Sequence, residues 1–287
     1  MNPHPEQPTS TGRTAIATGG LGPFTTRRVI RLIDGTEEVW QSRSARKQSR
    51  NPTEKTWWAP GALGWWLAVL FAIGSACFAI AAIPPVASAL GASSDNLLYF
   101  VGSLFFTTAG LLQYAEVAGI DQPGLVGFKA RAHTLITVDI GRIDWVAATI
   151  QSLGTLFFNI STGHALAMSA AQPDSINHAV WRPDAFGSIC FLVSSYLSWA
   201  EVCHGPGRIR PRGLSWWITT GNLVGSIAFG VSAIASKVLA DGDLRSATWT
   251  ALGTFIGGLC FLGASLLLLP ERTEAREGGP VPLPRPE

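Results

Sequence analysis

Residues 246–270 read SATWTALGTFIGGLCFLGASLLLLP, a run of 25 residues that contains no Asp, Glu, Lys or Arg. A helix needs about 20 mostly apolar residues to cross roughly 30 Å of hydrocarbon. Five further uncharged stretches precede this one, at 61–94, 96–115, 145–173, 185–200 and 213–236. The stretch 185–200 has only 16 residues and has to draw in Asp184 or Glu201 at an interface. The sequence therefore predicts an all-α integral membrane protein with six transmembrane helices.

The composition of the whole chain agrees with this fold class. Only 14% of its 287 residues are charged and 47% are hydrophobic, whereas a soluble globular chain carries about 25% charged residues. Six such runs in a soluble protein would leave too little polar surface. The net charge of +2 indicates no nucleic-acid partner. The four cysteines form no CxxC pair or zinc-finger spacing, so we expect no metal and no cofactor.

The six helices are expected to form three helical hairpins within one transmembrane domain, 61–269. Positive residues gather on one side of the predicted bilayer: eighteen Lys and Arg flank one side and three flank the other. The positive-inside rule then places both termini in the cytoplasm of a multi-pass protein of the cell membrane. The expected spans are 61–83, 95–117, 143–165, 182–203, 214–237 and 246–269.

The cytoplasmic N-terminal segment, 1–60, contains one stretch with hairpin chemistry. Residues 28–40 hold two short apolar runs around Asp34-Gly35, a pair that suits a two-residue type I′ turn. In that register Ile30 would face Val39 and Arg31 would face Glu38, a favourable cross-strand set. The sequence thus predicts a short β-hairpin there.

The segments on either side of this hairpin and at the other end of the chain have polar compositions. Residues 1–24 are rich in Pro, Thr, Gly and Ser and are expected to be disordered, as is the cytoplasmic tail 270–287. Residues 41–56 are expected to be a basic linker at the membrane surface. The lipid bilayer is then the expected partner, and four cations are expected to contact anionic headgroups: Arg43, Arg46, Lys47 and Arg50.

A short motif occurs once in every predicted helix: Gly, then a small residue, then two further positions, then Phe. Gly and Phe at i and i+4 lie on one helical face, and small residues let membrane helices approach closely. This packing motif predicts close helix contacts in which a Phe fills the space beside a neighbour's Gly. The six copies are Gly74-Ser-Ala-Cys-Phe78, Gly102-Ser-Leu-Phe-Phe106, Gly154-Thr-Leu-Phe-Phe158, Gly187-Ser-Ile-Cys-Phe191, Gly225-Ser-Ile-Ala-Phe229 and Gly257-Gly-Leu-Cys-Phe261.

Alternate helices share a further feature. Glu116, Glu201 and Glu271 each follow their motif glycine by fourteen residues. The repeating unit is therefore a hairpin of about 60 residues, and three copies in one orientation predict a pseudo-threefold axis along the membrane normal. Glu116 and Glu201 are expected to face cytoplasmic water or the nearby basic loops.

The paired G-S-x-x-F segments resemble the YrhK-like family of small bacterial membrane proteins. The likeness covers residues 60–270 and rests on this short motif. The resemblance implies an uncharacterised membrane protein and supplies no catalytic or binding residues.

Polar residues inside the predicted helices are the remaining candidates for function. Asn159 and Asn222 could bridge helices or line a polar cavity, and bridging is the more common role of such amides. At the outer face, His164, Arg182 and Asp184 could contribute to a ligand site, although their spacing requires none.

Three functions remain open at this point. The first is a structural or interaction protein of the membrane without enzymatic activity, which dry Gly–Phe packing at the bundle centre would favour. The alternative is a small-solute transporter or channel, which a water-lined cavity with inward-facing Asn159 and Asn222 would favour. The third is a membrane-embedded lipid enzyme, but the sequence contains no GxSxG, HExxH or P-loop motif.

Overall fold

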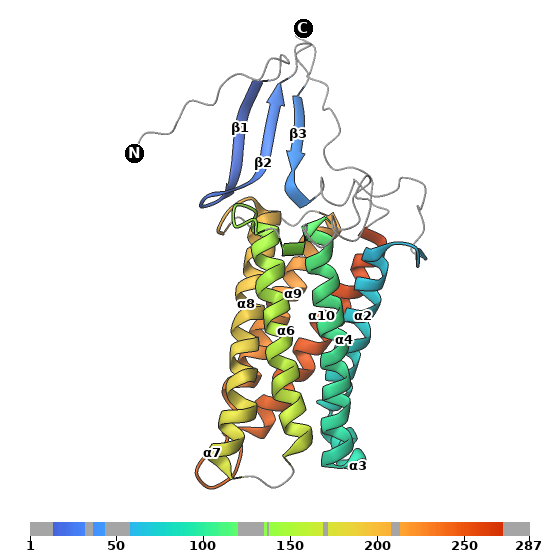
Figure 1. The fold of residues 1–287 in the computed structure, drawn as a ribbon, viewed down its shortest axis with the longest axis vertical. Helices are drawn as coiled ribbons and strands as arrows, with labels where there is room; N and C mark the ends of the chain where they lie inside the picture. The colour runs from blue at the N-terminus through green and yellow to red at the C-terminus, as the bar shows by residue number, and fades with distance from the viewer. Residues whose placement is uncertain are drawn as a thin grey trace.

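The computed structural model describes residues 14–31, 37–43, 58–119, 135–136, 138–168, 172–207 and 213–271. Within these residues, six long helices form one bundle, and a small β-sheet stands at one end of it (Figure 1). Short helical segments connect some of them: α3 (Pro84–Leu90), α7 (Pro173–Ile176) and a π-helical turn at Asn177–Trp181. The long helices are α2 (Leu63–Ala81), α4 (Ala92–Ala118), α6 (Ile143–Ala167), α8 (Arg182–Cys203), α9 (Gly213–Ala235) and α10 (Ala247–Glu271).

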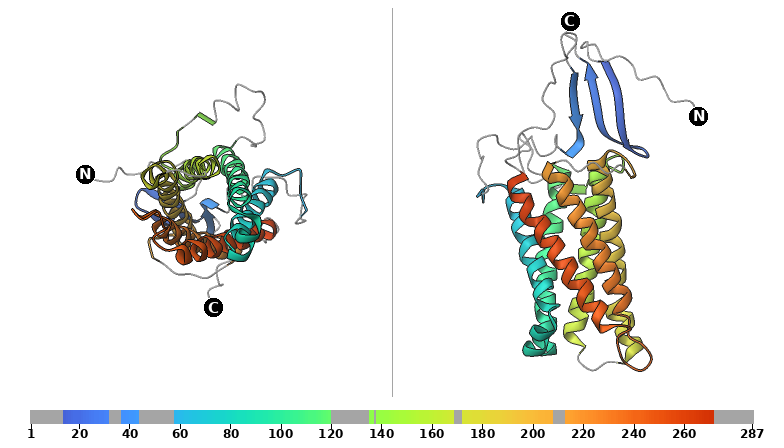
Figure 2. Two further views of the ribbon diagram at one scale, coloured as in Figure 1. Left: turned by 90° about the horizontal axis from the view of Figure 1, so that it is seen from below. Right: turned by 180° about the vertical axis from the view of Figure 1, so that it is seen from behind.

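The long helices form a closed ring, which is seen end-on in Figure 2. Each helix contacts the helix before it and the helix after it in the chain, and α10 closes the ring against α2. The outward surface is rich in exposed large apolar side chains, among them Leu104, Leu111, Ile189, Ile227 and Leu259. Such a surface suits hydrocarbon, because its side chains are apolar and the backbone polar groups of each helix are satisfied within the helix.

Five segments are long and apolar enough to cross a membrane: α2, α4, Pro173–Cys203, α9 and α10. The chain is therefore a multi-pass α-helical membrane protein. Helix α6 is outside this group although it has 25 residues. It carries several polar side chains, including Asp144, Gln151 and Asn159, and it lies in the ring between α4 and α8.

The observed helices differ from the predicted spans by at most three residues at either end. The largest difference is at α4, which begins at Ala92 instead of residue 95. Gly91, with φ of 75°, separates it from α3. Helix α8 follows the π-helical turn and α7 without a break, and Pro183 lies in the first turn of α8, where proline is tolerated.

The N-terminal sheet is larger than the predicted hairpin. It has three antiparallel strands in the order β1 (Thr14–Leu21), β2 (Phe24–Arg31) and β3 (Glu37–Gln41). The expectation that residues 1–24 are disordered is therefore wrong from Thr14 onward. Composition alone missed β1 because this strand depends on pairing with β2, from Leu21 opposite Phe24 to Thr14 opposite Arg31. Residues 1–13 and the tail from 272 onward lie outside the described residues.

The predicted pairing of the two other strands is wrong by one residue. Val29, rather than Ile30, lies opposite Val39, and Arg31 lies opposite Glu37. Arg31 Nη2 also donates to Glu37 Oε1 at 2.9 Å, an ion pair that the predicted register would not form. The Asp34-Gly35 turn lies outside the described residues.

Candidate functional site: the bundle axis and the sheet-end pocket

The six motifs bring neighbouring helices together in reciprocal pairs. A Cβ added at Gly74 of α2 would lie 2.6 Å from Phe106 of α4, and one added at Gly102 of α4 would lie 3.1 Å from Phe78 of α2. Each glycine therefore leaves room for the other helix's phenylalanine. The same exchange joins α6 to α8 and α9 to α10, with the pairs Gly154–Phe191, Gly187–Phe158, Gly225–Phe261 and Gly257–Phe229.

The position after the motif glycine meets the helix on the other side. Ser103 of α4 donates to Asn159 of α6 at 2.6 Å. Ser226 of α9 lies 2.8 Å from Ser195 of α8. Gly258 of α10 lies against the backbone of Ala79 of α2, where an added Cβ would be 2.8 Å from the Ala79 nitrogen. Adjacent residues point about 100° apart on a helix. The motif glycine therefore packs against one neighbouring helix, and the residue after it packs against the other.

The six motif phenylalanines meet at the axis of the bundle. Helices α2 and α9 are not neighbours in the ring, yet the rings of Phe78 and Phe229 are 5.9 Å apart. Phe106 of α4 likewise lies 5.9 Å from Phe261 of α10 and 6.0 Å from Phe191 of α8. All six rings, including Phe158, belong to one buried cluster. We call Phe78, Phe106, Phe158, Phe191, Phe229 and Phe261 the phenylalanine cluster.

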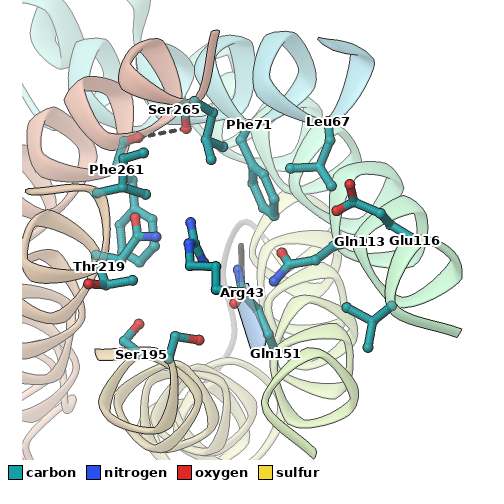
Figure 3. Close-up of a pocket in the computed structure, with 15 residues that line it drawn as sticks. Arg43, Leu67, Phe71, Gln113, Glu116, Gln151, Ser195, Thr219, Phe261 and Ser265 are labelled. Carbon is teal, nitrogen blue, oxygen red and sulfur yellow. Dashed lines mark hydrogen bonds between the residues drawn. The ribbon is translucent and has the colours of Figure 1, made fainter. Parts of the chain in front are cut away.

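Between the phenylalanine cluster and the sheet lies a cavity of about 70 Å³ with both polar and apolar walls, which we call the sheet-end pocket. A water molecule needs roughly 10–15 Å³ of such space, so the pocket has room for a few waters. Its floor includes Phe71 and Phe261, and polar side chains from five helices line its wall (Figure 3). These polar residues are Gln113, Glu116, Gln151, Ser195, Ser198, Thr219, Asn222 and Ser265.

One buried amide in this wall has unused hydrogen-bonding capacity. Gln151 is 8% exposed, and its Oε1 accepts a hydrogen bond from Ser194 at 2.9 Å. Among the residues that the structure describes, its amide nitrogen donates to none. The Gln151 amide nitrogen can therefore donate to a water molecule in the pocket.

The N-terminal segment enters the same pocket. Arg43, two residues beyond the end of β3, donates from Nε to Glu271 Oε1 at 3.1 Å and from Nη2 to Glu271 Oε2 at 3.4 Å. Its neighbour Ser42 donates to Glu201 Oε1 at 2.6 Å. Glu201 is only 2% exposed, so of the two expected surroundings, cytoplasmic water and the nearby basic loops, water is excluded. The sequence places these carboxylates at equivalent positions but gives no sign that Ser42 and Arg43 would bind them.

Arg43 also departs from its expected role at the membrane surface. Its side chain is 14% exposed and is ion-paired with Glu271 inside the protein. It is therefore engaged there instead of extending toward lipid headgroups, because a carboxylate at short range binds a guanidinium more strongly than a screened surface charge does. The other three expected contacts, Arg46, Lys47 and Arg50, lie outside the described residues.

The structure separates the two asparagines that the sequence placed together. Asn159 accepts from Ser103 and donates to Thr107, so it joins α6 to α4. It is a bridge between helices, while Asn222 lines the sheet-end pocket. Gln113 and Gln151, which the sequence did not favour over other polar residues, line the pocket with it.

The outer-face candidates Arg182 and Asp184 have different hydrogen-bond partners. Arg182 Nη1 lies 2.8 Å from His178 Nδ1, whereas Asp184 accepts from Ser236 of α9 at 3.5 Å. His164 lies in the last turn of α6. Among the described residues, no group of three or more His, Cys, Asp or Glu side chains is placed to hold a metal ion.

Comparison of the chain with family models, with curated proteins and with solved structures finds no match. The resemblance to the YrhK-like family therefore stays a prediction. The geometry of the bundle axis and of the sheet-end pocket is what remains to indicate function.

Proposed function

We propose that this chain is a structural or interaction protein of the membrane, a closed helical bundle that carries a small β-sheet at one end and conducts nothing. The observation that supports this proposal is the phenylalanine cluster. It contains one ring from each long helix, and rings from helices that are separated by one helix in the bundle lie about 6 Å apart. Apolar constrictions of this kind exclude water and with it ions and polar solutes.

The proposal includes α6 as the sixth membrane span, because it has the length of its neighbours and lies between two of them. With six spans, both termini lie on the same side of the membrane. The excess of Lys and Arg on that side favours the cytoplasmic side of the cell membrane. The three reciprocal Gly–Phe pairs support three hairpins as the repeating unit, in keeping with a YrhK-like membrane protein.

The sheet is attached to the bundle at three places, which supports a role in presenting it. Thr26 Oγ1 lies 2.9 Å from His204 Nδ1 at the end of α8, and Ser42 and Arg43 hold the end of β3. Thr26 is fully buried. A bundle that is fixed to its sheet in this way can hold an interaction surface at a defined position above the membrane.

Permeability of proteoliposomes tests the proposal. The purified chain is reconstituted, and efflux of potassium, protons and small neutral solutes is compared with that of protein-free vesicles. Wild type, Arg43→Ala and Phe191→Ala are measured in parallel. We expect all three to match protein-free vesicles, because Arg43→Ala leaves the cluster intact and Phe191→Ala leaves five rings in place.

The sheet-end pocket favours one alternative, a small-solute transporter or channel. Its amide and hydroxyl side chains could bind a polar solute on one side of the phenylalanine cluster. In that case the cluster would be a gate, and Arg43 a plug above it. Protein-dependent efflux from wild type or from either variant would contradict the scaffold and support this alternative.

A further inference from the structure

We propose that the sheet-end pocket is a binding site for a small cationic group of the guanidinium or ammonium type, and that Arg43 occupies this site from within the same chain. The inference goes beyond the scaffold proposal and does not rest on it. A ligand can bind in the pocket whether or not the bundle conducts.

The first support is the position of Arg43. Figure 3 shows its side chain in the middle of the helical ring, with Gln113 and Gln151 beside it. Arg43 belongs to the N-terminal segment and is separated from Glu271 by 228 residues. The other walls of the pocket come from the helices, and a cation from a different part of the chain extends into it. The structure thus already holds a guanidinium in this site.

The second support is the chemistry of the walls. Glu116 lines the pocket from α4, and Glu271, which lies outside the lining, accepts two hydrogen bonds from Arg43. The amides of Gln113, Gln151 and Asn222 can turn to present a carbonyl oxygen to a cation. These acceptors match the N–H donors of a guanidinium or an ammonium group, which have no lone pairs to offer.

The third support is the unfilled capacity of the pocket. Beside Arg43 there remains about 70 Å³. Withdrawal of Arg43 would add the volume of its side chain to that space. The pocket could then take a compact cation of a few heavy atoms together with water.

Occupation of the pocket is coupled to the sheet. Arg43 lies two residues beyond Gln41, the last residue of β3, and Ser42 binds Glu201 between them. A cation that displaces Arg43 therefore competes with the attachment of β3 to the bundle. In this way the concentration of the ligand would set how firmly the sheet is held.

Chemical rescue of the full-length protein tests the site. Thermal unfolding in detergent is measured for wild type, Arg43→Ala and the double variant Arg43→Ala/Glu271→Gln, with millimolar guanidinium chloride as the probe and equal NaCl as the control. We expect a lower Tm for Arg43→Ala and a saturable rise on adding guanidinium, roughly 3–6 °C at ten times its dissociation constant. Wild type, with its site filled, and the double variant, without the carboxylate, should show no saturable rise.

Two further variants cover other outcomes. Arg43→Lys retains a cation and should keep a Tm close to that of wild type without rescue. If Arg43→Ala does not fold, Arg43→Gln, which retains much of the stem, is purified with and without guanidinium. The proposal is overturned if guanidinium stabilises neither Arg43→Ala nor Arg43→Gln. It is also overturned if wild type and the double variant gain as much stability as Arg43→Ala.

Discussion

Replacement of Gly258 by Ala tests the close contact that closes the helical ring. A Cβ at Gly258 would lie 2.8 Å from the nitrogen of Ala79 and 3.0 Å from its Cα and Cβ. These atoms are backbone or directly attached to it, so α2 and α10 would have to move apart. Such overpacking costs about 1–3 kcal/mol, while exchange of Gly for Ala inside a helix gains about 0.5–1 kcal/mol.

The same helix offers a matched control in Gly263, where an added Cβ meets nothing within 4 Å. Gly263→Ala has the helix-propensity gain without the clash, so the difference between the two variants isolates the contact. We expect Gly258→Ala to be less stable than Gly263→Ala by about 1–3 kcal/mol. The free energy of unfolding of both variants is measured by titration with a denaturing detergent, at a constant concentration of a lipid-like detergent. Equal stabilities would refute the conclusion that α2 and α10 pack with their backbones in contact.

Three other substitutions probe separate parts of the account. Phe191→Ala should lower the free energy of unfolding by about 3–5 kcal/mol, since Phe191 is 1% exposed in the phenylalanine cluster. Phe186→Ala, on the outer surface of α8, is its control and should lower it by under about 1 kcal/mol in the same unfolding assay. Asn159→Leu should cost about 1–2 kcal/mol by removing the bridge to Ser103, and vesicle permeability should not change; a stability equal to wild type would argue against the bridge. His204→Gly keeps the left-handed backbone (φ 53°) but loses the contact with Thr26. Trypsin should then cleave the variant at Arg27 and Arg28 faster than it cleaves wild type. An unchanged cleavage rate would show that this contact does not hold the sheet.

The sequence was most informative where a physical constraint acts locally. Uncharged runs have to match the thickness of hydrocarbon, so they located the helices to within a few residues. The spacing of Gly154 and Phe158 on one face predicted that such pairs would pack, and their exchange with Gly187 and Phe191 follows that prediction. The lower apolarity of α6 has the same local origin, in side chains such as Asp144 and Gln151.

The sequence failed where the outcome depends on distant partners. Strand β1 forms because β2 offers it an edge, which the composition of residues 14–21 does not reveal. The pairing of Arg43 with Glu271 spans 228 residues, and a basic segment next to a membrane more commonly indicates lipid contact. Likewise, Asn159 and Asn222 are equivalent in sequence terms, and only the packing of α4 against α6 gives Asn159 two hydrogen-bond partners.

Six phenylalanines close the axis of this membrane-embedded bundle. An experimental structure of the full-length protein in lipid nanodiscs, at a resolution that shows ordered water, tests this closure directly. The account predicts ring-to-ring contact of Phe78, Phe106, Phe158, Phe191, Phe229 and Phe261 on the axis, with water confined to the sheet-end pocket. A continuous column of water past these rings, or rings turned outward toward lipid, would contradict it.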